Sequence, residues 1–289
     1  MGRPILVIGA AGLVGRHVVA ALAGREVVAT FHRDPVPDGV SLDITDAAAV
    51  RALVDRSGPS AIVLAAADPY VERCEREPAA TRRVNVEAAL AVRDAAAEVD
   101  ATLVVFSSEY VFDGTKGTYI EDDAVAPLNE YGRQKVDLER IARTVPRHLV
   151  LRISGVFGKE PRRKSFVWQL VDRLRSGGTF DVPSDQLITP TDASSLAHVV
   201  VELLDRGASG TFHAAGPDVL SRIDFAHTVA RAFALPIDRI VARPTAELGL
   251  LARRPERAGL GDAKLRALLG HGLARPADAL AALAQTVQA

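Results

Sequence analysis

Three glycines, each three residues from the next, follow a short apolar run near the start of the chain, in the segment Gly9-Ala10-Ala11-Gly12-Leu13-Val14-Gly15. Residues 5–8 have the pattern of a buried strand, and a helical pattern follows the glycines. In such a strand-turn-helix context, Gly9 permits a tight turn, Gly12 lets the backbone approach a pyrophosphate, and Gly15 lets the helix pack close to the sheet. The N-terminus of the helix would then face the anion. The segment predicts a dinucleotide-binding turn; the alternative is a glycine-rich turn that only packs.

Short apolar runs alternate with helical patterns along the first half of the chain. The runs expected as strands are 5–8, 26–31, 42–44, 62–66, 103–106 and 148–153. The segments expected as helices are 13–22, 47–56, 81–99 and 128–142. Alternation of this kind is typical of a parallel sheet with helices on both faces. We therefore expect an α/β fold with a Rossmann-like, doubly wound parallel sheet.

The pattern changes after Gly158, where the elements become shorter and proline is frequent. Helices are expected over 166–174 and 277–287. We expect residues 1–155 to form the dinucleotide-binding domain. Residues 156–289 should form a smaller, mainly substrate-binding portion over the carboxyl edge of the sheet, with some of its elements returning to the sheet.

Composition excludes several classes of protein. The formal net charge of −1 gives no general attraction to a nucleic acid polymer or an anionic membrane, and no apolar stretch approaches membrane-spanning length. Cys74 is the single cysteine, so intramolecular disulfides and cysteine-cluster metal sites are excluded, and a reduced, cytoplasmic setting is expected. The seven histidines are scattered without a paired ligand spacing, so no metal site is predicted.

The end of the second strand bears on the choice between the two nicotinamide cofactors. An NAD site needs an acidic residue there to hold the ribose 2′-hydroxyl, but the stretch is Ala29-Thr30-Phe31-His32-Arg33. Arg33 could instead pair with a 2′-phosphate, so NADP(H) is expected in preference to NAD(H). The alternative is that Arg33 is solvated and Asp34 takes its place. Asp43 and Ile44 are expected at the adenine edge. The other positions expected to line the cofactor are Ala11, Leu13, Val14, His32, Ala65, Ala66, Ala67 and Asn85.

Tyr131 and Lys135 lie four residues apart in a helical segment, so their side chains should share one face. A nearby ammonium favours the phenolate and would bring a tyrosine toward working pH. Ser108 is expected just after the strand 103–106, where its hydroxyl could donate to a substrate carbonyl. Tyr131 would then give a proton to the developing alkoxide, and Lys135 would also anchor the nicotinamide ribose. The alternative is that Ser108 caps a turn and Tyr131 is a surface aromatic.

Longer segments carry a family resemblance. Phe106-Ser-Ser-Glu-Tyr-Val-Phe-Asp-Gly114 with Pro127-Leu-Asn-Glu-Tyr-Gly-Arg-Gln-Lys135 resembles the extended short-chain dehydrogenase/reductases, and among them the dTDP-4-dehydrorhamnose reductase family. Further segments resemble that family in the same order along nearly the whole chain. These are 71–75, 84–86, 151–158, 185–186, 190–191, 210–216 and 254–255 with Leu260.

The resemblance implies NADPH- or NADH-dependent reduction of a keto group on a nucleotide-activated deoxysugar, of the dTDP-4-dehydro-6-deoxyhexose type. It gives Ser108 the usual Thr/Ser catalytic position, makes Tyr131 the acid and makes Lys135 its partner. Glu109 departs from the Asp that is common beside that Thr. The substrate is expected to contact Ser108, Glu109, Tyr110, Arg162 and Gln186. A homodimer is compatible with the resemblance, but metal use at a dimer contact finds no ligand cluster in this sequence.

Two other functions remain open at this stage. A close relative of the family, the regulatory subunit of methionine adenosyltransferase, keeps the fold and binds NADP while serving a partner enzyme. The Ser-Tyr-Lys set favours catalysis over such a regulatory subunit. The third function is a sugar-nucleotide epimerase or dehydratase of the same superfamily. A dehydratase would carry extra acids beside Ser108, where Glu109 is the one candidate.

Overall fold

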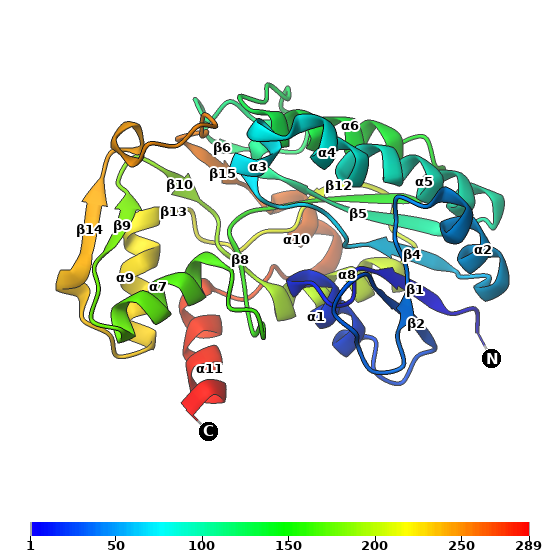
Figure 1. Cartoon of the computed structure of the whole chain (residues 1–289), viewed down its shortest axis with the longest axis horizontal. Coiled ribbons are helices and arrows are strands. Elements are labelled where there is room, and N and C mark those ends of the chain that lie inside the picture. Colours follow the sequence, from blue (N-terminus) through cyan, green and yellow to red (C-terminus); the bar gives the residue numbers. More distant parts are fainter. Residues whose placement is uncertain (1, 289) are drawn as a thin grey trace.

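A seven-stranded parallel sheet in the order β12-β7-β5-β4-β1-β2-β3 forms the centre of the computed structural model, which describes residues 2–288 (Figure 1). Its strands are β1 (Ile5–Ile8), β2 (Val27–Phe31), β3 (Val40–Ser41), β4 (Ala61–Leu64), β5 (Thr102–Ser108), β7 (His148–Ile153) and β12 (Gly210–His213). The strand order reverses between β1 and β4, and ligands of open α/β sheets bind at the carboxyl ends of the strands beside such a reversal. The expected Rossmann-like, doubly wound fold is confirmed.

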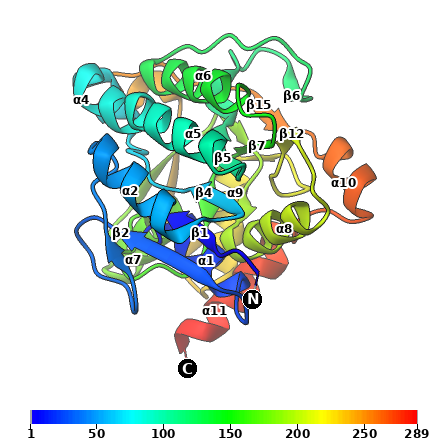
Figure 2. The same ribbon diagram turned by 90° about the vertical axis from the view of Figure 1, so that its right-hand side faces the viewer.

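Helices cover both faces of this sheet (Figure 2). One face packs against α1 (Leu13–Ala21) and α8 (Ala193–Asp205), and the other against α2 (Ala47–Ser57), α5 (Ala88–Glu98) and α6 (Glu130–Ala142). The residues of β1 divide between the two cores, because successive side chains of a strand point to opposite faces. Ile5 and Val7 join the core under α1 and α8, whereas Leu6 and Ile8 join the other. This two-sided burial explains why the strands appear as continuous apolar runs.

A second core lies beside the main sheet, in the lobe on the left of Figure 1. Its elements are α7 (Phe166–Arg175), α9 (Arg222–Ala232), α11 (Pro276–Gln288) and the paired strands β9 (Phe180–Pro183) and β14 (Ile240–Arg243). Trp168 is buried in this core and donates its indole N–H to the Gly158 carbonyl at 2.8 Å. The chain leaves this lobe after β9 to build α8 and β12, so two elements from the second half belong to the main sheet and its cover.

Short elements complete the fold. They are α3 (Val71–Arg76), α4 (Pro78–Arg82), β6 (Gly117–Tyr119), β8 (Val156–Phe157), β10 (Leu187–Ile188), β11 (Thr191–Asp192), β13 (Leu220–Ser221), β15 (Ala258–Leu260) and α10 (Ala263–Leu269). Four single-turn helices accompany them: Arg83–Glu87, Glu109–Val111, Ile237–Arg239 and Thr245–Leu248. Three short strand pairs, β8 with β11, β10 with β13 and β6 with β15, are formed by segments far apart in the chain.

Five sequence expectations need correction, and the first is the strand expected over 62–66, which is Ala61–Leu64. The third strand is Val40–Ser41 and not 42–44, because Asp43 bonds the backbone N–H and hydroxyl of Thr45 and turns the chain there. The fifth strand continues to Ser108, since its pairing with β7 extends that far. The helix expected over 81–99 contains a π-helical turn at Arg83–Glu87. The expected loop 109–130 contains a helical turn and β6, which pairs with β15.

A buried ion pair joins α6 to the sheet. Arg152 of β7 donates to both carboxylate oxygens of Glu139 at 2.8 and 2.9 Å, and both side chains are almost fully buried. Ser107 of β5 donates to the same carboxylate at 2.5 Å. Although burial disfavours the charged carboxylate, the Arg152 guanidinium holds the pKa of Glu139 below its usual range. Removing one partner of such a pair would leave an uncompensated buried charge, at a cost of about 3–5 kcal/mol.

His213 of β12 completes this network as a neutral imidazole. Its Nδ1 lies 3.2 Å from the Gly261 carbonyl oxygen, which makes Nδ1 the protonated nitrogen, and its Nε2 lies 3.4 Å from the Arg152 guanidinium. Burial, together with the charge of Arg152, lowers the pKa of His213 to about 4. His213 is completely buried.

The stability of the protein should therefore fall in acid because of His213. Its folded pKa is about 4, below the value near 6.5 expected in the unfolded chain, so the unfolded state binds the proton first as the pH falls. The contribution of neutral His213 to the free energy of unfolding is complete above about pH 6.5. It decreases by as much as about 3 kcal/mol by pH 4. The measurement is urea unfolding across this pH range. The free energy of unfolding should fall less steeply with falling pH for His213→Asn, whose amide can still donate to Gly261, than for the exposed control His198→Asn. Equal pH slopes in these two variants would contradict the assignment.

Candidate functional site

The glycine turn lies between β1 and α1 at the carboxyl end of the sheet. Gly9 has a φ of +93°, and a Cβ there would lie 2.6 Å from the backbone nitrogen of Ala66 on the neighbouring strand end. A Cβ on Gly15 would lie 2.2 Å from the Gly9 carbonyl oxygen. Gly12 is the exposed N-cap of α1, and the first turn of that helix carries no acidic residue. Since the turn brings bare backbone to an uncompensated helix N-terminus, its geometry fits a pyrophosphate.

The end of β2 carries a group of exposed basic residues. His32 and Arg33 are both exposed, and their charges add to the two Thr45 hydrogen bonds that principally lower the pKa of Asp43. Arg162, which is expected to contact substrate, forms an ion pair with Asp34, the residue after Arg33. The structure thus brings Arg162 to the strand end where an adenosine ribose would lie.

Ile44 lies at the adjacent edge of the sheet. It is nearly buried and lines a small pocket of about 120 Å³ together with Arg83 and Glu87. Asp43, its neighbour, is exposed and fixed by bonds to the Thr45 backbone and hydroxyl at 2.9 and 2.7 Å. These two residues therefore flank the strand end at which an adenine ring was expected.

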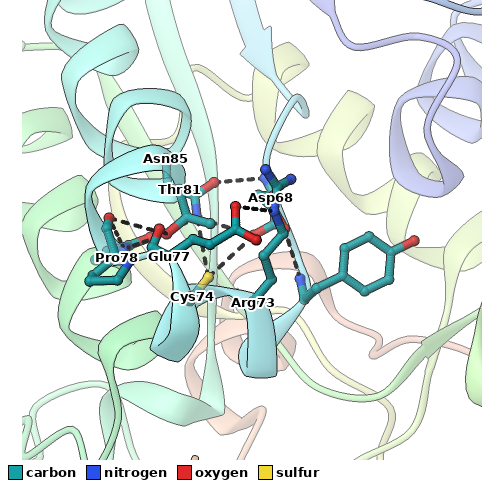
Figure 3. A network of polar contacts seen from close by, with 9 residues as sticks. Asp68, Arg73, Cys74, Glu77, Pro78, Thr81 and Asn85 are labelled. Atoms are coloured by element: carbon teal, nitrogen blue, oxygen red, sulfur yellow. Dashed lines mark hydrogen bonds and ion pairs between the residues drawn. The ribbon is translucent and has the colours of Figure 1, made fainter.

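Asn85 holds the segment that follows β4. Its amide oxygen accepts from the backbone N–H of Asp68 at 2.7 Å, and its amide nitrogen donates to the Asp68 carbonyl at 3.0 Å and to Gln134 of α6 at 2.8 Å (Figure 3). Because Asn85 is buried and its polar atoms are engaged in this way, it fixes Asp68, the residue that follows Ala67. The π-helical turn places it at this contact.

Tyr131 and Lys135 share one face of α6, as their spacing predicts. Asn129 caps this helix by accepting from the Gly132 N–H at 2.9 Å. The Lys135 ammonium lies 5.4 Å from the centre of the Tyr131 ring and donates to the Phe106 carbonyl of β5 at 2.8 Å. Tyr131 is partly exposed and packs edge-on against Tyr110, with ring centres 5.6 Å apart.

Ser108 lies at the end of β5 and has two hydrogen-bond partners. Its hydroxyl lies 2.6 Å from a carboxylate oxygen of the buried Glu109 and accepts from the Tyr110 backbone N–H at 3.3 Å. It thus caps the helical turn Glu109–Val111. Glu109 and Ser108 both influence the pKa of Tyr131. The structure therefore brings Ser108, Glu109, Tyr110, Tyr131 and Lys135 together.

The titration of the pair differs from the sequence expectation. Burial, followed by the negative charge of Glu109, raises the pKa of Tyr131 above its ordinary value. Burial also lowers the pKa of Lys135 to about 8. Desolvation disfavours the charged forms of both groups, and Lys135 is not among the causes that shift the pKa of Tyr131. The lowering of the tyrosine pKa by Lys135 stays a prediction.

A pocket of about 460 Å³ lies between α3 on the sheet side and α7 and α9 of the second lobe. Its lining is Pro69, Tyr70, Val71, Glu72, Phe166, Gln169, Arg222 and Arg254. Arg254 pairs with Glu72 at 2.7 Å and lies 3.3 Å from the Tyr110 hydroxyl, so the pocket borders the Ser108–Tyr131 group. Two arginines and two aromatic rings in one pocket suit a phosphorylated ligand with a ring system.

Gln186 supports this pocket by holding the side chain of Arg222, one of its lining residues. It is buried, accepts from the Arg222 side chain at 2.8 Å and donates to the Thr245 hydroxyl at 2.9 Å. Sequence reasoning named Gln186 but missed Arg222, for which no local pattern exists. Arg254 was noted only within a family-like segment, and Gly132 only as part of the motif around Tyr131.

The described residues contain neither a cluster of metal-binding side chains nor a helix that could span a membrane. Between residues 2 and 288, no group of three or more His, Cys, Asp or Glu side chains is arranged to hold a metal ion. Within the same part of the chain, no helix combines the length and apolar character needed to cross a bilayer.

Comparisons with known proteins agree with this geometry. A probable low-salt glycan biosynthesis reductase, Agl14, from Haloferax volcanii is 34% identical over 288 residues and covers 96% of each chain. Methionine adenosyltransferase 2 subunit beta from Pongo abelii is 33% identical over 277 residues, covering 92% of this chain and 82% of its own. The crystal structure of a hypothetical dTDP-4-dehydrorhamnose reductase from Sulfolobus tokodaii matches with a TM-score of 0.85 and 30% identity, covering 92% of this chain and 94% of that one.

The family model for the RmlD substrate-binding domain matches residues 3–289, which is nearly the whole chain. Together with the two relatives above 30% identity, this match agrees with the resemblance to dTDP-4-dehydrorhamnose reductases. The chain belongs to the RmlD substrate-binding domain family.

Proposed function

We propose that this chain is an NADPH-dependent reductase of a keto group on a nucleotide-activated deoxysugar, of the dTDP-4-dehydro-6-deoxyhexose type. The observation that carries the proposal is the meeting of Ser108, Tyr131 and Lys135 at the carboxyl end of β5, at the same edge as the glycine turn. One relative is named as a probable reductase. The proposed substrate class follows the name of the hypothetical dTDP-4-dehydrorhamnose reductase from Sulfolobus tokodaii. A cytoplasmic homodimer is the setting we propose for it.

The bound nicotinamide would supply the hydride. The Ser108 hydroxyl would hold the substrate carbonyl oxygen, on which negative charge develops as the hydride arrives. The Tyr131 hydroxyl would transfer its proton to this oxygen and complete the alcohol. Lys135, tied to the Phe106 carbonyl, would hold its ammonium beside Tyr131 and the nicotinamide ribose. The raised pKa of Tyr131 keeps the phenol protonated before the reaction, as an acid requires.

The pocket of about 460 Å³ would receive the nucleotide part of the substrate. Arg222 and Arg254 would face its diphosphate, and Tyr70 and Phe166 offer ring surfaces for the base. Gln186 would act through Arg222, whose side chain it holds. At the cofactor, Arg33 would favour the 2′-phosphate of NADPH, and Arg162 lies beside the same strand end.

A second candidate function rests on the similarity to methionine adenosyltransferase 2 subunit beta. In that case the chain would bind the cofactor and serve a partner enzyme without catalysing reduction. The assembled Ser108–Tyr131–Lys135 group favours the reductase.

Tyr131→Phe should lower kcat by about 10²–10⁴-fold, because it removes the proton donor and keeps the ring packed against Tyr110. The measurement is NADPH consumption with a panel of 4-keto-6-deoxy sugar nucleotides. NADPH binding, followed by fluorescence, should remain unchanged. Turnover unaffected by the substitution would rule out the proton-transfer role, and tight NADPH binding without turnover of any substrate by the natural chain would favour the regulatory function.

Arg33→Ala should raise the KM for NADPH about tenfold or more and leave the KM for NADH unchanged, because only NADPH carries the 2′-phosphate. Arg51→Ala, which removes an exposed arginine of α2 paired with Glu98 at 3.9 Å, is the matched control. A variant that retained a strong NADPH preference would count against Arg33.

Gly132→Ala should reduce kcat by about tenfold or more, because a small misplacement of catalytic groups is costly. A Cβ at this position would meet the Tyr110 carbonyl oxygen at 2.2 Å, so α6 would move away from Ser108 and take Tyr131 with it. Arg133→Ala, at the exposed neighbouring position of the same helix, is the control and should retain activity. Equal activity of both variants, with unchanged far-ultraviolet circular dichroism, would contradict this role of Gly132.

A further inference from the structure

The hydroxyl of Ser108 has one proton to donate, and the neighbouring Glu109 carboxylate can accept it. Its oxygen lies 2.6 Å from Oε2 of Glu109 and also accepts from the Tyr110 backbone N–H at 3.3 Å. If Glu109 is a carboxylate, it is an acceptor only, so the Ser108 proton must point to it. The serine could then not donate to a substrate carbonyl oxygen without breaking a short, buried, charge-assisted bond.

A protonated Glu109 reverses the direction of this bond. The carboxylic acid donates its O–H to Ser108, whose two lone pairs then accept from Glu109 and from the Tyr110 N–H. The serine proton is left free to donate toward the substrate. The same change removes the negative charge of Glu109, which is one of the causes that raise the pKa of Tyr131.

We propose that Glu109 works as a neutral carboxylic acid that donates to Ser108 and thereby directs the Ser108 hydroxyl at the substrate carbonyl. Glu109 is thus a positioning residue that acts through Ser108. The proposal rests on the reductase function, and it gives a role to the glutamate that stands where the family commonly has aspartate. No bond to Glu109 is made or broken in the reaction, because its proton stays on the carboxyl group throughout.

The surroundings of Glu109 determine how firmly it holds its proton. The polar groups around Glu109 include Ser108 of β5, Tyr110 of its own turn, Tyr131 of α6, Ser154 after β7 and Arg222 of α9. Arg222 carries the one positive charge among them, and its guanidinium is already held by Gln186. Glu109 itself is only 4% exposed. Burial outweighs the hydrogen bond from Ser108 and the charge of Arg222, and it raises the pKa of Glu109 above its ordinary value.

The test compares Glu109→Gln, whose amide can donate to Ser108 at every pH, with Glu109→Ala and with the exposed control Glu98→Gln. We expect kcat/KM of the natural chain to fall as the pH rises through the Glu109 titration. Glu109→Gln should retain kcat/KM within about threefold at low pH and lose that descending limb, whereas Glu109→Ala should lose about tenfold or more. The limb that belongs to Lys135, whose pKa is about 8, should remain in all three variants.

Two outcomes would overturn the proposal: a rate that rises as Glu109 loses its proton, or a Glu109→Gln profile identical to that of the natural chain. In a Ser108→Ala background the Glu109 substitutions should have no further effect, because Glu109 acts through that hydroxyl. Infrared difference spectra of Glu109→Gln against the natural chain give a readout that needs no turnover. The natural chain should show the stretching band of a protonated carboxyl group that Glu109→Gln lacks. An absent band overturns the proposal even if turnover is found, and a present band without turnover refutes the reductase function alone.

Discussion

The contact between α6 and the strands β5 and β7 is the constraint on which the site depends. Tyr131, Lys135 and Glu139 follow one another at four-residue intervals along this helix, and Lys135 and Glu139 are buried whereas Tyr131 is partly exposed. Lys135 is tied to the β5 backbone and Glu139 to Arg152 of β7. Polar groups buried in this way are tolerated because each has a partner. The directional bonds also fix the rotation of α6 about its axis and its distance from the sheet. The position of Tyr131 over Ser108 is therefore set by interactions below it, with Gly132 allowing the close approach.

Burial at this contact shifts the protonation equilibria of Tyr131, Glu109 and Lys135. Burial raises the pKa of Tyr131 and of Glu109 and lowers that of Lys135, so each group is driven toward its neutral form. Glu139 is the exception, because Arg152 neutralises it. The site thus keeps an acid, a phenol and an amine close together with little net charge, while a permanent ion pair one turn further along the helix supplies rigidity.

The sequence predicted the features that depend on local pattern. The glycine turn, the alternation of strands and helices, and the shared face of Tyr131 and Lys135 follow from spacing alone, and the structure confirms these placements. Spacing carried no information about contacts between distant segments. Arg162 meets Asp34, and Arg222 reaches Gln186 and the pocket of about 460 Å³, because the second lobe folds back on the sheet. The direction of the tyrosine titration also could not be predicted, because it depends on burial.

Arg222 connects the pocket to Glu109. It lines the pocket, belongs to the second lobe, and is the positive charge that most stabilises the Glu109 carboxylate. A diphosphate held by Arg222 would neutralise that positive charge. The pKa of Glu109 would then rise, because the cation would no longer stabilise its carboxylate. Substrate binding would then favour the neutral form of Glu109, and with it the free Ser108 hydroxyl. In this arrangement the nucleotide portion of the substrate, distant from the keto group, would help to prepare the serine that holds the keto oxygen.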